Sequence, residues 1–229
     1  MYSKKVSVDG TKTTLGVSGN NGFKLTVGTD TIGYGIRNPL CLAASDRGVV
    51  IGTTDNASGV VFAGLESDNT TGPFTIANYG SGADNMSVAT TSGCDMTYAS
   101  NLNSGDNRTF YMAYDNVTVL NVFKLIDNSS NAGGGAITIG APITQALGAT
   151  AQGIHIGVNS DDAAVVLVDN GTNAILYRMD NSTATSLTLL YDYTSLSSGS
   201  GVALGVNGKK YTIVTGKAAK TNVRVFYDE

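Results

Sequence analysis

The sequence lacks several features that mark common classes of protein. Charged residues make up 14% of its 229 residues, and 14 Lys and Arg against 18 Asp and Glu give a net charge of −4. A nucleic-acid partner needs a basic surface that displaces counterions, so we expect none. No apolar run approaches the ~18 residues of a membrane-spanning helix, so we expect no membrane insertion. Residues 1–8 are basic without an apolar run behind them, so we expect no signal peptide.

Cysteine, proline and tryptophan are also scarce. The two cysteines, Cys41 and Cys94, lie 53 residues apart, and a fold held together by disulfides normally has more of them. We therefore predict two free, buried thiols in preference to a disulfide. The three prolines, Pro39, Pro73 and Pro142, interrupt none of the clearest strand patterns, and there is no Trp.

Short runs of alternating apolar residues dominate what is present. A period of two indicates β-strands, and the 29 glycines suit many tight turns. Five of these runs end in a small residue after a similar sequence. The aligned small residues, 36 to 58 residues apart, are Gly16, Gly52, Ala99, Gly157 and Gly205. Five repeats in 229 residues give a mean of about 46, the length of a four-stranded propeller blade.

The repeats divide the chain into five units of up to four strands. The predicted strands are 14–17, 23–27, 31–36 and 40–43 in the first unit; 49–53, 60–65, 74–79 and 86–90 in the second; 96–100, 108–114, 117–126 and 136–143 in the third; 154–158, 163–168, 173–179 and 186–193 in the fourth; and 202–206, 211–214 and 222–227 in the fifth. Asp and Asn recur in the turns between them, as at Asp115-Asn116 and Asp169-Asn170. These residues tolerate left-handed backbone and therefore favour short hairpins.

We predict an all-β fold, a five-bladed β-propeller that forms a single domain over residues 1–229. The fifth unit has three strands, and residues 4–8 are predicted to complete this C-terminal blade and close the ring. A small residue at or near the end of the first strand of each unit favours the ring, because the first strands of the blades crowd together near the axis. The alternative is a β-sandwich or jelly roll with the same strands.

No residues are predicted to form a catalytic, cofactor or metal site. His155 is the only histidine, so a catalytic triad or a zinc site lacks its partners and a structural role is preferred. Asp95 begins a predicted inner strand, where a ring-shaped glycosidase carries a carboxylate, but most other acids fall in turns. Asp161 and Asp162 offer oxygen ligands to Ca²⁺, although a solvated turn is preferred.

Tyrosine is the main aromatic residue, with 11 copies, most of them in or beside predicted strands. A half-exposed tyrosine can stack on a sugar ring or anchor a protein interface. Packing between neighbouring sheets is the simpler interpretation for each of them, so the binding residues stay unassigned.

The blade pattern resembles the short-repeat β-propellers, whose outer strand often reads like residues 136–144, Ala-Ile-Thr-Ile-Gly-Ala-Pro-Ile-Thr. Five-bladed members of that group include small lectins, which rely on Trp-containing blades. A composition rich in Gly, Thr, Ser and Asn and poor in Cys is similar to that of bacteriophage virion proteins.

These resemblances imply a non-enzymatic virion structural or accessory protein, a protein-binding module in capsid decoration, a tail or a fibre. Its partners would be capsid or tail proteins, and it could form a symmetric assembly with them. It would be assembled in the host cytoplasm and then located in the virion. The alternative is a lectin-like protein that binds cell-surface glycans, and the third candidate is a glycosidase-like enzyme that uses Asp95 or His155. No cofactor is expected.

Overall fold

The computed structural model of the protein is built of β-strands. It describes residues 3–6, 12–15, 25–27, 30–32, 41–46, 48–55, 59–66, 75–79, 94–102, 104–105, 107–127, 137–180, 185–194, 202–217 and 220–228. The strands of the first half are β1 (Ser3–Val6), β2 (Lys12–Leu15), β3 (Leu25–Val27), β4 (Asp30–Ile32), β5 (Cys41–Ala44), β6 (Gly48–Asp55), β7 (Gly59–Glu66), β8 (Thr75–Tyr79) and β9 (Cys94–Tyr98). Those of the second half are β10 (Arg108–Asn116), β11 (Val119–Asp127), β12 (Ile137–Ile139), β13 (Ile143–Ala146), β14 (Gly153–Val158), β15 (Ala164–Asp169), β16 (Asn173–Met179), β17 (Thr188–Thr194), β18 (Val202–Asn207), β19 (Lys210–Lys217) and β20 (Lys220–Tyr227). The described residues contain no α-helix, and η2 (Ser100–Leu102) is a single 3₁₀ turn.

The strands form antiparallel sheets in which neighbours in the chain pair with each other. β1 pairs with β2, and β3 with β4. The larger sheets have the orders β5-β6-β7-β8, β12-β11-β10-β9 with β13 also on β11, β14-β15-β16-β17, and β18-β19-β20. Short hairpins make this order natural, because an antiparallel pair needs only a tight turn between its strands. The all-β prediction is therefore confirmed.

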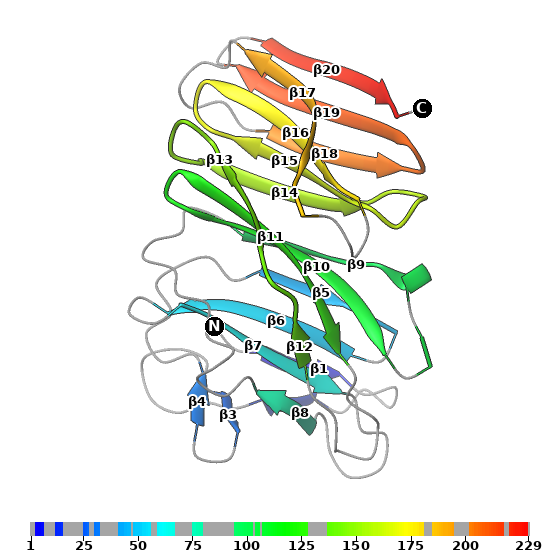
Figure 1. The fold of residues 1–229 in the computed structure, drawn as a ribbon. Helices are drawn as coiled ribbons and strands as arrows, with labels where there is room; N and C mark the ends of the chain where they lie inside the picture. Colours follow the sequence, from blue (N-terminus) through cyan, green and yellow to red (C-terminus); the bar gives the residue numbers. More distant parts are fainter. Residues whose placement is uncertain are drawn as a thin grey trace.

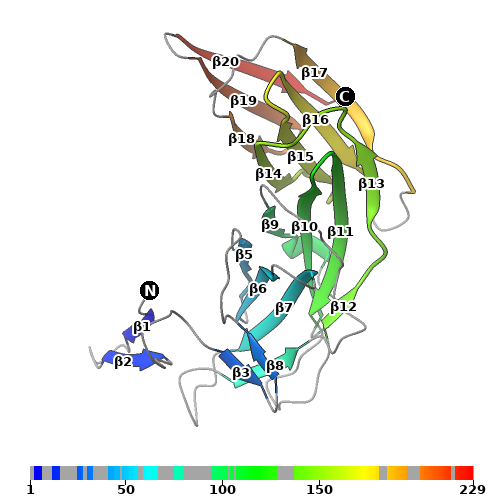
Figure 2. The same cartoon turned by 90° about the vertical axis from the view of Figure 1, so that its left-hand side faces the viewer.

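The predicted five-bladed ring is wrong, because no sheet of the described chain closes and the predicted closing strand pairs elsewhere. β1 pairs along its length with β2, with Lys4 opposite Thr14, and not with the C-terminal sheet. The last sheet has three strands, and β1 and β20 lie at opposite ends of the molecule (Figure 2). The open, stacked sheets are compatible with the alternative, a β-sandwich type of packing.

Successive large sheets pack face to face, and each interface contains its own hydrophobic core (Figure 1). One core joins β5 to β9–β11 around Phe110 and Phe123. A second joins β10 and β11 to β14–β16 around Tyr111, and a third joins β15–β17 to β18–β20 around Tyr211. Burial and the nearby charge of Asp162 raise the pKa of Tyr111 to about 12. Burial of a central strand on both faces explains the unbroken apolar run of five residues, 164–168, in β15. All six residues of the strand are buried, including Asp169 at its end.

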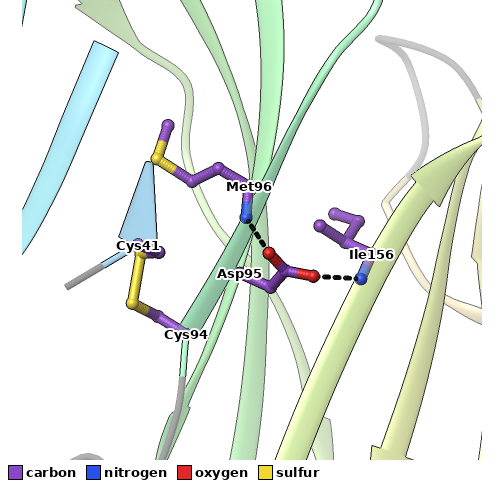
Figure 3. The surroundings of a disulfide bond; sticks show 5 residues. All are labelled: Cys41, Cys94, Asp95, Met96 and Ile156. Atoms are coloured by element: carbon purple, nitrogen blue, oxygen red, sulfur yellow. Dashed lines mark hydrogen bonds between the residues drawn. A yellow bond between two sulfur atoms is a disulfide. The ribbon is translucent and has the colours of Figure 1, made fainter. Parts of the chain in front are cut away.

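The first strands of the four large sheets lie next to one another, and each adjacent pair is tied directly. A disulfide joins Cys41 of β5 to Cys94 of β9 (Figure 3). The Asp95 carboxylate of β9 accepts a hydrogen bond from the Ile156 amide of β14 at 2.9 Å. On β14, Gly157 packs so closely on the next sheet that a Cβ atom there would lie 2.6 Å from Val206 Cγ2 of β18. We call these four strands, β5, β9, β14 and β18, the inner strands.

The prediction of two free thiols is wrong, because the fold brings β5 beside β9. Cys41 and Cys94 have a Cα–Cα distance of 5.5 Å, within the range of ordinary disulfides.

Most predicted strands are found, with boundaries shifted by a few residues. The fourth unit matches best, since residues 173–179 coincide with β16. In the third unit, the predicted outer strand 136–143 is two strands, β12 and β13, both paired with β11. In the second unit, the predicted first strand corresponds to β6, which is the second strand of its sheet because β5 pairs on its other side. Residues 86–90 lie outside the described residues.

The five aligned small residues have different surroundings. Ala99, just after β9, is 1% exposed, and Gly157 has the close contact with β18. Gly52 lies on β6 rather than on an inner strand, and Gly16 lies outside the described residues. Gly205 of β18 is exposed, and a Cβ added there would lie 3.8 Å from Thr212 Cβ of its own sheet. Close packing of a side chain from the next sheet therefore accounts for Gly157 but not for all five small residues.

Asp and Asn side chains build the described turn between β15 and β16 as predicted. Asp169 Oδ1 accepts a hydrogen bond from the Gly171 amide at 2.7 Å, and Asn170 Oδ1 accepts one from the Asn173 amide at 2.8 Å. Gly171 has φ +84°, a left-handed conformation that favours glycine. These bonds satisfy the backbone of the hairpin.

The turn between β10 and β11 holds a residue unsuited to its backbone, and its replacement should stabilise the fold. Val117 has φ +59° and is 40% exposed, and a β-branched residue pays a steric cost in the left-handed region. We expect Val117→Asn to raise the free energy of unfolding by about 1 kcal/mol, because Asn tolerates that region. Denaturant unfolding measures the change. Val117→Thr, also β-branched, is the matched control, and equal stability of the Asn and Thr variants would contradict the prediction.

Candidate functional site

The candidate site lies at the rim between the last two sheets, where β17 packs against β20. Both are the outermost strands of their sheets. Side chains alternate along β20, so Arg224 and Phe226 face β17 while Val223, Val225 and Tyr227 face away from it. Figure 1 shows the two strands, and we call the four side chains through which they contact each other, Tyr191, Tyr193, Arg224 and Phe226, the rim site.

Two side-chain contacts form the rim site, one between a cation and an aromatic ring and one between two aromatic rings. The Arg224 guanidinium lies over the Tyr193 ring, 4.7 Å from its centroid. The Tyr191 and Phe226 rings are 4.3 Å apart with an interplanar angle of 44°. Arg224 is exposed and both tyrosines are half-buried, so the site presents flat apolar surface beside planar N–H donors.

A polar network holds the end of β20 on the preceding sheet. Asp228, directly after β20, accepts hydrogen bonds from the Arg178 guanidinium of β16 and from the Tyr211 hydroxyl, the latter at 2.9 Å. Asn159 donates to the same hydroxyl at 2.9 Å, and Arg178 also pairs with Asp180. Burial would raise the pKa of Asp228, but the bonds from Arg178 and Tyr211 bring it below the ordinary value. This network fixes one end of β20 and so helps to position the rim site.

The two candidate catalytic residues lie outside the rim site. Asp95 uses both carboxylate oxygens in hydrogen bonds with backbone amides, Oδ1 with Met96 at 2.9 Å and Oδ2 with Ile156 (Figure 3). It therefore ties β9 to β14. His155 is half-buried on β14, opposite Leu167 in the neighbouring strand. That the protein is not an enzyme stays a prediction.

Asp161 and Asp162 lie in the turn between β14 and β15. Asn159 Oδ1 accepts hydrogen bonds from the amides of Asp161 at 3.0 Å and Ala163 at 2.9 Å. The Lys209 ammonium lies 3.0 Å from Asp161 Oδ2, and Asp162 has φ +60° with its Oδ1 buried and unbonded. Within the ranges that the structure describes, no three His, Cys, Asp or Glu side chains group as metal ligands do.

The tyrosines divide into packing and surface residues. Tyr111, Tyr114, Tyr177 and Tyr211 are buried, as the packing interpretation predicts. Tyr191 and Tyr193 are half-buried at the rim, and Tyr227 is 72% exposed. Arg224 and Phe226 were not singled out from the sequence, although β20 alternates an apolar face with a face that carries Arg and Phe. Their partners lie on β17, over 30 residues earlier, so no local pattern identifies the pairs.

Comparison with known proteins finds no matching family model and no similar curated protein. The resemblance to propeller lectins and virion proteins therefore stays a prediction. No helix in the described part of the chain is long and apolar enough to span a membrane.

Proposed function

We propose that the protein is a non-catalytic, carbohydrate-binding protein that uses the rim site. The observation that carries this proposal is the Tyr193–Arg224 pair, an aromatic ring with an exposed guanidinium over it. Sugars have an apolar face of C–H groups and a periphery of hydroxyls. The half-buried tyrosine offers a flat apolar surface to the C–H face of the sugar, and the arginine offers N–H donors to the hydroxyl groups.

The position of the rim site supports the same proposal. β17 and β20 are held by the buried core beneath them and by the Arg178–Asp228 pair, so the aromatic groups are positioned before a ligand arrives. Preorganised groups lose less conformational entropy on binding, which matters for a site with few contacts. Because few contacts would hold the ligand, we nevertheless expect each single site to bind weakly.

A glycan array followed by calorimetric titration of the best glycan tests the proposal. We expect Tyr193→Ala and Arg224→Ala each to weaken binding at least tenfold, because each removes one half of the pair. Tyr227→Ala is the matched control, since Tyr227 lies on the same strand as Arg224 but faces away from β17. Thermal unfolding of each variant verifies that it folds. No glycan bound by the wild-type protein, or unchanged binding by both rim variants, would refute the proposal.

A second candidate is the virion accessory role, which the exposed apolar side of β20 favours. Val223, Val225 and Tyr227 are 61%, 44% and 72% exposed, a pattern typical of a protein-docking surface. The disulfide also suits a particle that persists outside cells. Co-sedimentation with viral particles supports this role, and a protein that never associates with a particle argues against it.

A further inference from the structure

The outward face of the last sheet, β18–β20, carries a row of exposed apolar side chains. Of the five large hydrophobic residues exposed in the described chain, three lie on this face, namely Val223, Val225 and Tyr227. Strand register places them beside outward-facing residues of β19 and β18. Across the sheet the rows are Ala203, Val214 and Val223; Gly205, Thr212 and Val225; and Asn207, Lys210 and Tyr227. We call these nine residues the terminal face.

The terminal face contains a glycine notch like the one through which the preceding sheet contacts its neighbour. On β14, Gly157 leaves a notch that Val206 of β18 fills, at 2.6 Å from where a Cβ would be. Gly205 is the aligned residue of β18, at the end of the same five-residue motif. Its notch meets only Thr212 of its own sheet, at 3.8 Å and 3.9 Å. The last sheet thus has an open notch at Gly205 that could hold a valine from another sheet packed on it.

We infer that the terminal face packs against the terminal face of a second copy of this chain. The face is self-complementary in shape, because one outer column is small and the other is large. The small column on β18 is Ala203, Gly205 and Asn207, and the large column on β20 is Val223, Val225 and Tyr227. A two-fold axis parallel to β19 and between the two sheets places the large column of each copy over the small column of the other.

This arrangement pairs specific residues. Val225 enters the notch at Gly205 of the partner subunit, as Val206 enters the notch at Gly157. In the adjacent row, Val223 faces Ala203 of the partner subunit. Side chains from two sheets interdigitate in this way in β-sandwiches, whose strands are aligned within about 30°. Lys210 lies at one end of the face, with its ammonium 5.8 Å from the Tyr227 ring, so the two lysines can point to solvent.

The size of the face sets the expected strength of the dimer. Three strands about 4.8 Å apart, with about six residues each, span roughly 15 by 20 Å. A standard interface buries about 800 Å² on each partner, and this face of roughly 300 Å² is less than half of that. We therefore expect a dimer that forms at high protein concentration and dissociates on dilution.

Sedimentation velocity over a concentration series tests the dimer. We expect the wild-type protein to shift from monomer to dimer, and Val225→Lys to weaken self-association at least tenfold because it places a charge in the apolar notch. Gly205→Val fills the same notch without adding charge and should have a similar effect. Leu189→Lys is the matched control, since Leu189 is also an exposed strand residue, at 57%, but lies on β17. The control should dimerise like the wild type.

Two results would overturn the dimer. A wild-type protein that stays monomeric at the highest soluble concentration shows that a different partner covers the face or that none does. A Val225→Lys protein that dimerises like the wild type shows that the copies meet elsewhere. The rim variant Tyr193→Ala should dimerise normally, so failure of the dimer and failure of the carbohydrate proposal are distinguishable.

Discussion

Reduction of the Cys41–Cys94 disulfide should lower the free energy of unfolding by about 4 kcal/mol. The bond closes a loop of 53 residues, and a loop of this length removes that much conformational freedom from the unfolded chain. It also ties two inner strands, β5 and β9, whose sheets share the core around Phe110 and Phe123. A loss of this size is a large part of the stability of a typical domain.

Chemical denaturation with and without reductant measures this effect. The double variant Cys41→Ser, Cys94→Ser should match the reduced wild-type protein and should not respond to reductant. Mass spectrometry of the oxidised protein should show the mass of the disulfide-bonded form. Equal unfolding midpoints for the oxidised and reduced wild-type protein would contradict the prediction.

Gly157→Val should destabilise the fold by about 3 kcal/mol. The new Cβ would lie 2.6 Å from Val206 Cγ2 and 3.2 Å from Val206 Cβ, so one of the two strands must move. Val206 has a stiff, β-branched side chain and is held between β14 and β19, so it cannot rotate away cheaply. Overpacking of a filled core usually costs about 1–3 kcal/mol, and this site lies at the upper end because both atoms are close to the strand backbone.

The same substitution at Gly205 is the control for this prediction. Gly205 occupies the aligned position of β18, where the nearest atom to a new Cβ is at the ordinary distance of 3.8 Å. Gly205→Val should change the monomer's free energy of unfolding by less than about 0.5 kcal/mol. Thermal unfolding at low protein concentration compares the two variants. Adding Val206→Ala to Gly157→Val should restore part of the loss, and a cost as large at position 205 as at 157 would refute the proposed contact.

The individual strands were predictable from the sequence, but their long-range arrangement was not. Local alternation defined residues 173–179 as a strand because side chains of a strand alternate between two faces. The strand β5 was assigned to the wrong sheet because its pairing with β6 depends only on a short turn, which the repeat spacing does not reveal. Ring closure required residues far apart in the chain to meet, and local patterns carry no information on that.

The candidate site was predictable only in its residue type. The sequence shows that tyrosines in strands can stack on a sugar ring, but it favours packing for each of them and does not distinguish the tyrosines of β17 from the others. Arg224 was not singled out, because its role depends on how β20 stacks over β17. The disulfide was missed for the same reason, since the pairing of Cys41 with Cys94 follows from the contact between two sheets and not from the number of cysteines.

The ties between inner strands also determine how the molecule can deform. The disulfide, the bond from Asp95 to Ile156, and the contact of Gly157 with Val206 all lie along one side of the stack. At the opposite side of the last interface, β17 and β20 meet through ring and cation contacts, with the Arg178–Asp228 pair near one end. The last interface is therefore held at both edges, by the Gly157–Val206 contact on the side of the inner strands and by the ring, cation and Arg178–Asp228 contacts at the rim. Because both edges are held, the spacing of Tyr193 and Arg224 is set by the folding of the stack, and a ligand does not have to create it.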